Sequence, residues 1–269
     1  MERTSGLEFA SRTDPGLIRA QNEDALAFSP EFGYAVLADG MGGYNAGEIA
    51  SGIAVAVVVG LLDEKLPGLD GPVHALLSEA VQAANHEVFQ AAQSRPDYRG
   101  MGTTLVAALF RRGRILVAHV GDSRLYRLRN GGLARLTADH SVVQEQIELG
   151  LLDARDAANS PERHLLTRAL GVGEQVLADL TEHVVQPDDL YLLCSDGLTD
   201  MLADDDIAHL LVAHGRSPDT AASMLVQAAN DRGGHDNVSV LLVRAGSAEA
   251  EAGDESLLGR LYRQMRRSS

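Results

Sequence analysis

The stretch from residue 103 to residue 137 constrains the fold most, because it reads as consecutive short strands joined by tight turns. Arg112-Gly113 separates the first two strands, and Asn130-Gly131, a strong type I′ hairpin signal, separates the last two. The strands are predicted at 104–110, 115–120, 124–129 and 133–137. The stretch is therefore expected to be an antiparallel meander.

Helices and strands fall into separate blocks along the rest of the chain. Two long helices rich in Ala, Val, Leu and Gln are predicted at 46–62 and 73–94, with Pro67-Gly68 between them. Segregated helices and antiparallel strands are typical of an α+β domain, here with packed sheets inside and helices outside. The other predicted elements are strands at 7–13, 34–39, 180–185, 190–194 and 238–244, and helices at 141–149, 204–214 and 218–230.

The chain shows no repeat and no internal linker, so we expect one domain over residues 1–246. The irregular, polar stretch 142–173, which contains Pro161, is long for a connection and is expected to form a mobile flap. After the last strand the sequence turns to Gly, Ser, Ala and Glu, and then to a basic stretch at 257–267. We expect 247–269 to be a flexible acidic-then-basic tail, with an amphipathic docking helix as the alternative.

Composition limits the partners and the compartment. The chain has 269 residues and a formal net charge of −15, which argues against nucleic acid, because binding a phosphate backbone needs clustered Lys and Arg. The single cysteine, Cys194, excludes an intramolecular disulfide and a thiolate zinc site. The longest apolar run, 49–62, is short for a membrane span, and residues 1–19 lack the apolar core of a secretory signal. We therefore expect a cytoplasmic protein.

Short motifs place acidic residues beside glycine at the ends of predicted strands. Asp39 and Asp196 end strands and Asp236 begins one, so the three carboxylates converge if these strands are neighbours. Carboxylate oxygens suit Mg²⁺ or Mn²⁺, and glycine lets the backbone approach an ion closely. Read singly, each Asp-Gly pair is also an ordinary turn. The motifs are Asn22-Glu23-Asp24, Asp39-Gly40-Met41-Gly42-Gly43, Ser195-Asp196-Gly197 and Gly233-Gly234-His235-Asp236-Asn237.

Two further residues are candidates for the same site. Asp122 also follows a predicted strand, although a hairpin turn explains it equally well. Arg19 lies just before the first acidic motif, and a guanidinium beside a metal cluster can clamp a phosphate in bidentate fashion. On its own, an arginine is usually a solvated surface charge. Thr103 and Thr104 are expected to begin a buried strand rather than contact a substrate.

Taken in order, the motifs resemble those of the metal-dependent phosphatases of the protein phosphatase 2C type, in particular the bacterial members. The resemblance implies a four-layer αββα sandwich, in which helices flank two packed antiparallel sheets. It also implies hydrolysis of phosphoserine and phosphothreonine at a centre of two Mn²⁺ or Mg²⁺ ions. The matching motifs are Arg19-x-x-Asn22-Glu23-Asp24, Ala38-Asp39-Gly40-Met41-Gly42-Gly43, Gly102-Thr103-Thr104, Val120-Gly121-Asp122-Ser123-Arg124, Asp139-His140-Ser141, Leu166-Thr167-Arg168-Ala169-Leu170-Gly171, Ser195-Asp196-Gly197-Leu198 and Asp236-Asn237-Val238-Ser239.

The same resemblance implies roles for the main metal ligands. Asp39 bridges the two ions and is thereby a catalytic candidate. Asp196 and Asp236 bind one ion, and the carbonyl of Gly40 helps to hold the other. In the implied reaction, the ions lower the pKa of a shared water, so that hydroxide attacks phosphorus in line without a phosphoenzyme.

Supporting residues follow from the resemblance as well. Glu23 and Asp24 are implied as ligands through water, and Asp122 joins Asp196 in a third, weaker metal site. Arg19 is the second catalytic candidate, since it holds the phosphate of the substrate.

The proton donor and the partners are less completely defined. Met41 stands where the eukaryotic pattern often has a histidine that is taken as general acid, and methionine has no proton to donate. Protonation of the leaving group is therefore unassigned. The implied partners are phosphorylated proteins, namely a cognate Ser/Thr kinase and its substrates, and the chain is expected to be a monomer.

Other phosphate chemistries fit the sequence less well. A cysteine-dependent phosphatase needs an arginine six residues after Cys194, where the chain has Asp200. Kinases and P-loop proteins need a lysine beside a glycine-rich loop, and the only lysine, Lys65, is distant from Asp39. The main alternative is a catalytically silent scaffold or sensor of the phosphatase fold that binds phosphoproteins. Because the metal carboxylates are retained, the sequence favours activity.

Overall fold

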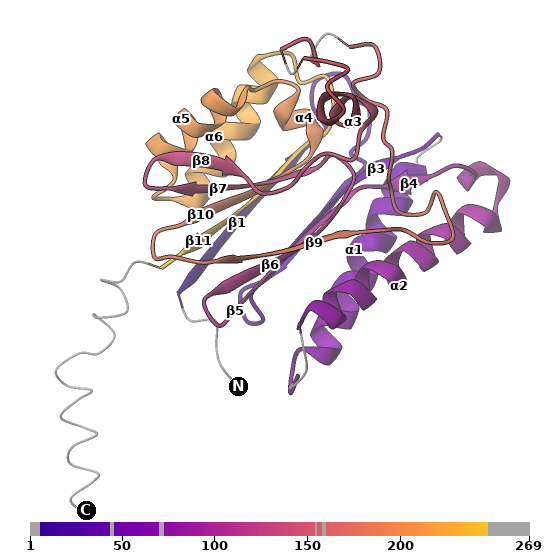
Figure 1. Cartoon of the computed structure of the whole chain (residues 1–269), viewed down its shortest axis with the longest axis horizontal. Helices are drawn as coiled ribbons and strands as arrows, with labels where there is room; N and C mark the ends of the chain where they lie inside the picture. Colours follow the sequence, from indigo (N-terminus) through magenta and orange to yellow (C-terminus); the bar gives the residue numbers. More distant parts are fainter. Residues whose placement is uncertain (1–5, 44–45, 70–72, 154, 158–159, 247–269) are drawn as a thin grey trace, which may run out of the picture.

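Two antiparallel sheets pack face to face, and helices cover the outer face of each sheet (Figure 1). This computed structural model confirms the αββα sandwich expected from the sequence. The predicted tail at 247–269 lies outside the described residues. The structure describes residues 6–43, 46–69, 73–153, 155–157 and 160–246.

The last strand of the chain, β11, lies inside the first sheet rather than at its edge. It consists of β1 (Leu7–Asp14), β7 (Arg124–Arg129), β8 (Gly132–Arg135), β10 (Leu190–Cys194) and β11 (Val238–Ala245). The order is β1-β11-β10-β7-β8, so β11 lies between β1 and β10. The outer face of this sheet is covered by α5 (Asp204–His214) and α6 (Pro218–Asp231), and the short α4 (Asp196–Thr199) follows β10.

The second sheet carries the two long helices. It consists of β2 (Asp24–Ser29), β3 (Tyr34–Met41), β5 (Leu105–Arg111), β6 (Arg114–Val120) and β9 (Asp179–Val184), in the order β2-β3-β5-β6-β9. The short β4 (Gly102–Thr103) pairs with β3. The covering helices are α1 (Ala46–Lys65) and α2 (Val73–Ser94), and the remaining elements are the 3₁₀ helix η1 (Pro96–Tyr98) and α3 (Val142–Glu148).

Central strands are covered on both faces, which explains their uninterrupted apolar runs. In β11, Val240 and Leu242 pack against the helices of the first sheet, whereas Leu241 and Val243 pack between the sheets. Successive side chains of a strand point to opposite faces. Because each face meets an apolar layer, β11 shows no alternation of polar and apolar residues.

Helix α1 is long and apolar enough to cross a membrane by length and composition alone, and it is longer than the apolar run noted in the sequence. The helix packs against β3 and α2. Ala50, Ala54, Val58 and Leu62 are fully buried in that contact. Its position in the core therefore accounts for its composition.

The predicted meander is wrong at its centre. β5 pairs with β6 and β7 pairs with β8, but β6 and β7 belong to different sheets. The chain crosses at Gly121, whose φ of +104° suits glycine, and a Cβ added there would lie 2.6 Å from Thr104 Cγ2. Turn residues such as Gly121-Asp122 occur both in hairpins and where a chain passes from one sheet to another. The motif alone therefore does not distinguish the two. Neither β2 nor α4 is predicted from the sequence.

The flap stretch 142–173 connects the two sheets and contains α3. Hydrogen bonds to the residues before α3, to β4 and to α2 hold its later part in place. Thr167 N donates to His140 O at 2.9 Å, and Leu170 N donates to Thr103 O at 2.8 Å. These bonds place the flap beside β4 and β3, at one end of the sandwich.

Candidate metal centre

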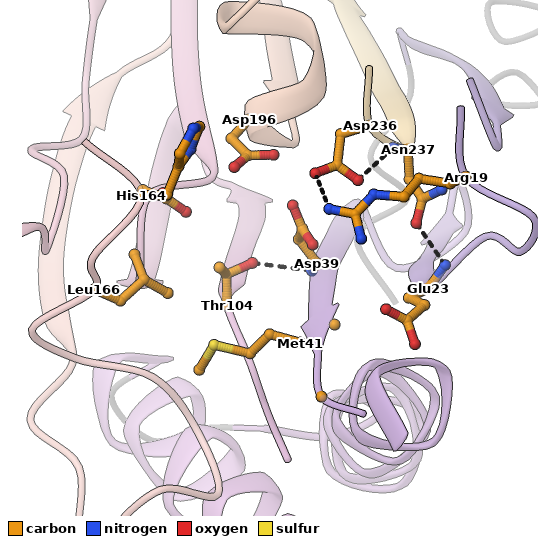
Figure 2. A pocket seen from close by; sticks show the side chains of 13 residues that line it. Arg19, Glu23, Asp39, Met41, Thr104, His164, Leu166, Asp196, Asp236 and Asn237 are labelled. Atoms are coloured by element: carbon orange, nitrogen blue, oxygen red, sulfur yellow. Dashed lines mark hydrogen bonds and ion pairs between the residues drawn. The ribbon is translucent and has the colours of Figure 1, made fainter. Parts of the chain in front are cut away.

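A cavity of about 380 Å³ lies where both sheets and the flap meet. Figure 2 shows the carboxylates of Asp39, Asp196 and Asp236 pointing toward one another, with Arg19 beside Asp236. The lining residues are Arg19, Glu23, Asp39, Gly40, Met41, Gly42, Thr104, Asp122, His164, Leu166, Asp196, Asp236 and Asn237.

The backbone of Asp39 is held by Thr103 of β4 and by Thr104, which lies between β4 and β5. Asp39 N donates to Thr104 Oγ1 at 2.9 Å. Asp39 O accepts hydrogen bonds from Thr104 N at 2.9 Å and from Thr103 Oγ1 at 2.8 Å. The direction of the Asp39 carboxylate is therefore set by strand pairing.

Asn237 joins the loop that carries Arg19 to the loop that carries Asp236. Its Oδ1 accepts from Glu23 N at 2.8 Å, and its Nδ2 donates to Gln21 O at 2.8 Å. Arg19 Nη2 donates to Asp236 Oδ2, also at 2.8 Å (Figure 2). The guanidinium and this carboxylate are thus fixed relative to each other.

Burial and mutual repulsion act together on the carboxylates. Burial, followed by repulsion from Asp24 and Asp196, raises the pKa of Asp39 well above its usual value. Burial is also the largest cause that raises the pKa of Asp24 to about 7, that of Asp196 to about 6, and that of Asp122. Arg19 is the only Arg or Lys among the described residues that line the cavity. Full ionisation of these groups near neutral pH therefore needs added positive charge.

The donor set fits divalent cations. Carboxylate oxygens from both sheets face one cavity, and such hard ligands suit Mg²⁺ and Mn²⁺. Asp24 Oδ1 is buried and finds no hydrogen-bond partner among the described residues. At Gly40, an added Cβ would lie 2.1 Å from Gly47 O, so the backbone beside Asp39 packs directly on the start of α1. A cation in the cavity would offset the negative charge of the carboxylates that converge there.

All but one of the predicted site residues line the cavity. The exception is Asp24, which lies opposite Asp39 in the β2–β3 pair and accepts a hydrogen bond from Ser195 Oγ at 2.9 Å. It therefore supports the cavity from behind. The predicted residues that line the cavity are Arg19, Glu23, Asp39, Gly40, Asp122, Asp196 and Asp236.

Some polar groups at the cavity are not predicted from the sequence. His164 comes from the flap, and its Nδ1 lies 3.6 Å from Asp200 Oδ2. One donor atom each of His164, Asp196 and Asp200 lies within 4.8 Å of the others, a spacing compatible with metal ligation. No sequence spacing reveals this group, because it forms only when the flap folds back. Thr104 is buried as expected, and it also lines the cavity.

Packed antiparallel sheets with a carboxylate-lined cavity and a neighbouring arginine are the features of a metal-dependent phosphatase. The sequence model of the protein phosphatase 2C family matches residues 19–231, and the chain belongs to this family. The resemblance inferred from the ordered motifs is thereby confirmed.

Bacterial serine/threonine phosphatases are similar to this chain along most of its length. Serine/threonine protein phosphatase PstP of Mycobacterium tuberculosis is 41% identical over 238 residues, which cover 88% of this chain and 44% of PstP. Serine/threonine phosphatase stp of Listeria monocytogenes is 39% identical over 236 residues, which cover 86% of this chain and 93% of stp. The chain thus spans less than half of PstP and nearly all of stp.

Solved structures share the fold. The crystal structure of M. tuberculosis PstP/Ppp has a TM-score of 0.83 at 39% identity, covering 90% of this chain and 99% of that one. The catalytic domain of PstP in complex with two manganese ions has a TM-score of 0.81 at 38% identity, with the same coverage. A relative with this fold therefore binds two manganese ions.

Proposed function

We propose that this chain hydrolyses phosphoserine and phosphothreonine esters in proteins, with two Mn²⁺ or Mg²⁺ ions bound in the cavity. The convergence of the Asp39, Asp196 and Asp236 carboxylates beside Arg19 carries the proposal. Membership of the protein phosphatase 2C family and the two manganese ions of the PstP domain support it.

Asp39, Asp196 and Asp236 would hold the two ions, with help from the carbonyl of Gly40. Such ions lower the pKa of water toward neutrality and offset the charge that develops on the phosphoryl group. Asp39 suits the shared position, because its carboxylate faces both others and its backbone is held by the hydrogen bonds described above (Figure 2).

Further carboxylates would support this pair of ions. We propose that Glu23 and Asp24 act through water, Glu23 from the cavity wall and Asp24 from behind Asp39. We also propose that Asp122, together with Asp196, holds a third and weaker ion. Asp122 lines the same cavity at the crossing between the sheets.

Arg19 receives the phosphate in this proposal. Its side chain is 54% exposed, and the pairing with Asp236 both orients the guanidinium and raises its pKa, so the group stays charged. A planar guanidinium can hold two phosphate oxygens at once. Arg19 therefore orients the phosphorus for in-line attack by water.

The leaving oxygen needs a proton as the ester bond breaks. Met41 lines the cavity and has none to donate. We propose that solvent water supplies this proton. One bond forms between a water oxygen and phosphorus, one P–O bond breaks, and the products are inorganic phosphate and a free Ser or Thr hydroxyl.

Phosphorylated proteins are the substrate class that the family implies. We propose that a cognate Ser/Thr kinase and the substrates of that kinase are among the partners, because such a kinase makes the esters that this chain would remove.

Hydrolysis of a phosphothreonine peptide tests the proposal, with Mn²⁺, with EDTA, and with Asp39→Asn and Asp196→Asn. Asp219→Asn on α6 is the matched control, since Asp219 is exposed and pairs with Arg12 on the surface. The expected result is Mn²⁺-dependent turnover that both cavity variants lose and the control keeps. Absence of turnover in folded, Mn²⁺-loaded wild type that still binds phosphopeptides would instead indicate a catalytically silent scaffold.

A further inference from the structure

His140 makes a two-point contact with the residue before Asp122. His140 N donates to Gly121 O at 2.8 Å, and Gly121 N donates back to His140 Nδ1 at 3.1 Å. The His140 side chain is 3% exposed, so water does not compete for these bonds. The imidazole therefore fixes Gly121 N, whereas the backbone of His140 fixes Gly121 O.

The bond from Gly121 also sets the tautomer of His140. Because Nδ1 accepts a hydrogen bond, the ring proton of the neutral imidazole lies on Nε2. Nε2 lies 3.3 Å from Asp179 Oδ2 on β9, and Asp179 Oδ1 accepts from Arg168 Nη1 of the flap at 2.9 Å. The two ring nitrogens thus face different parts of the molecule.

Asp122 is anchored on its other side as well. The hydroxyls of Ser123 and Thr104 share a hydrogen bond of 2.7 Å, and Thr104 Oγ1 also accepts from Asp39 N. Asp122 therefore stands between two residues whose positions are fixed, Gly121 by His140 and Ser123 by Thr104. One short network connects the Asp122 loop to the backbone of Asp39.

The backbone contacts of Gly121 and Ser123 matter because like charges act on the Asp122 carboxylate. Asp196 and Asp139 repel it, whereas Arg124 attracts it. Repulsion between like charges opposes the approach of Asp122 to Asp196, so a fixed backbone is needed to direct the side chain there. The Gly121 and Ser123 contacts provide that direction.

We propose that His140 is a positioning residue that uses Nδ1 to direct Asp122 into the cavity, and thereby sets the affinity of the third ion that Asp122 shares with Asp196. The proposal rests on the third ion of the proposed function. Residues that orient metal ligands from behind typically change metal affinity by about 10–100-fold when they are replaced.

Two replacements separate the ring nitrogens. In His140→Asn, Oδ1 takes the place of Nδ1 and can accept from Gly121 N. In His140→Gln, the amide NH₂ takes the place of Nε2 and can donate to Asp179, whereas no acceptor remains for Gly121. A merely structural role for a buried polar side chain would make the two variants alike.

Direct binding of Mn²⁺, followed by the electron paramagnetic resonance signal of free Mn²⁺, tests the proposal on the full chain without any reliance on turnover. The variants are His140→Asn, His140→Gln and Asp122→Asn, with His183→Gln on β9 as the matched control. We expect Asp122→Asn to lose the weakest ion and His140→Gln to weaken it about tenfold or more. His140→Asn and the control should bind as wild type does.

Each of the other possible binding results contradicts a specific part of the proposal. If Asp122→Asn loses the weakest ion but His140→Gln binds it as wild type does, the positioning role of His140 is wrong and the third ion is supported. Equal weakening by His140→Asn and His140→Gln also overturns it. Wild-type binding in Asp122→Asn overturns the third ion and the inference with it. If His140→Gln does not fold, His140→Ser, whose side chain is too short to reach Gly121, takes its place with the same expected loss.

Discussion

Asp24 and Asp39 are register partners in the β2–β3 pair, so two carboxylates with raised pKa values lie side by side, Asp39 in the cavity wall and Asp24 behind it. Directly opposite residues of an antiparallel pair have Cβ atoms about 4.5–5.5 Å apart. At that separation two ionised carboxylates in a protein environment repel each other. Without a cation, the native state therefore holds protons here near neutral pH.

Asp39→Asn is expected to stabilise the metal-free protein in alkaline buffer. A carboxylate whose folded-state pKa is raised contributes stability that is complete below its unfolded pKa, near 4, and is lost as pH rises through the folded value, about 7 for Asp24. Removal of one charge should recover about 1–2 kcal/mol in the free energy of unfolding at about pH 8. Urea unfolding in EDTA measures this, and a lower value for the variant contradicts it.

The same variant should lose its response to metal. A ligand that binds only the native state, present at about a hundredfold excess over its Kd, adds about 3 kcal/mol to the free energy of unfolding. Mn²⁺ should therefore raise the melting temperature of wild type and of Asp219→Asn, and leave that of Asp39→Asn unchanged. Thermal scans with Mn²⁺ and with EDTA decide the point, and an equal shift in all three proteins would remove Asp39 from the ligands.

His119 should make the protein sensitive to acid. Burial, with a smaller effect from the His140 ring 4.7 Å away, lowers the pKa of His119 to about 4. The unfolded chain takes up this proton near pH 6.5 and the folded chain only near 4, so stability falls as pH drops through that window. His119→Phe cannot titrate and should remove about 3 kcal/mol of the fall. Urea unfolding at about pH 7 and about pH 4.5 measures the change in the free energy of unfolding between the two pH values. If His119 is not responsible, this change is the same in His119→Phe as in wild type.

Arg19 should govern substrate binding through the shape of its guanidinium as well as through its charge. Arg19→Lys keeps the charge and loses the two-pronged contact, so kcat/KM for a phosphothreonine peptide should fall about tenfold or more. Arg12→Lys is the control, because Arg12 pairs with Asp219 on the surface. Steady-state kinetics measures both, and full activity in Arg19→Lys would show that charge alone suffices.

Gly40 should tolerate no side chain. In Gly40→Ala the new Cβ would meet Gly47 O at 2.1 Å, whereas a Cβ at Gly43 has no neighbour within 4 Å. Overpacking of this kind costs about 1–3 kcal/mol, and here it also shifts the backbone next to Asp39. Thermal unfolding should show a loss in Gly40→Ala and almost none in Gly43→Ala, and equal melting temperatures would refute the close approach.

Elements with strong local patterns could be predicted from the sequence. The helix at Val73–Ser94 and the strands at Arg124–Arg129 and Leu190–Cys194 have the predicted bounds. Asn130 and Gly131 both have positive φ, as the predicted type I′ turn requires. In each case the residues that decide the structure lie next to one another in the chain.

Features that depend on distant segments could not be predicted in the same way. Gly121 looks like a hairpin turn, and only the packing of two sheets makes it a crossing. His164 reaches Asp200 only because the flap returns to the cavity. The carboxylates that converge were found as glycine-bounded motifs, whereas Asn237 holds its neighbours through hydrogen bonds that no motif reveals.

β11 lies between β1 and β10, so β1 cannot join the first sheet until residues 238–245 have been synthesised. Asp236 and Asn237 emerge just ahead of that strand and take their places only when it inserts. A nascent chain therefore carries Asp39 and Asp196 without the third carboxylate. Insertion of this single strand therefore completes the first sheet and brings Asp236 to the cavity in one step.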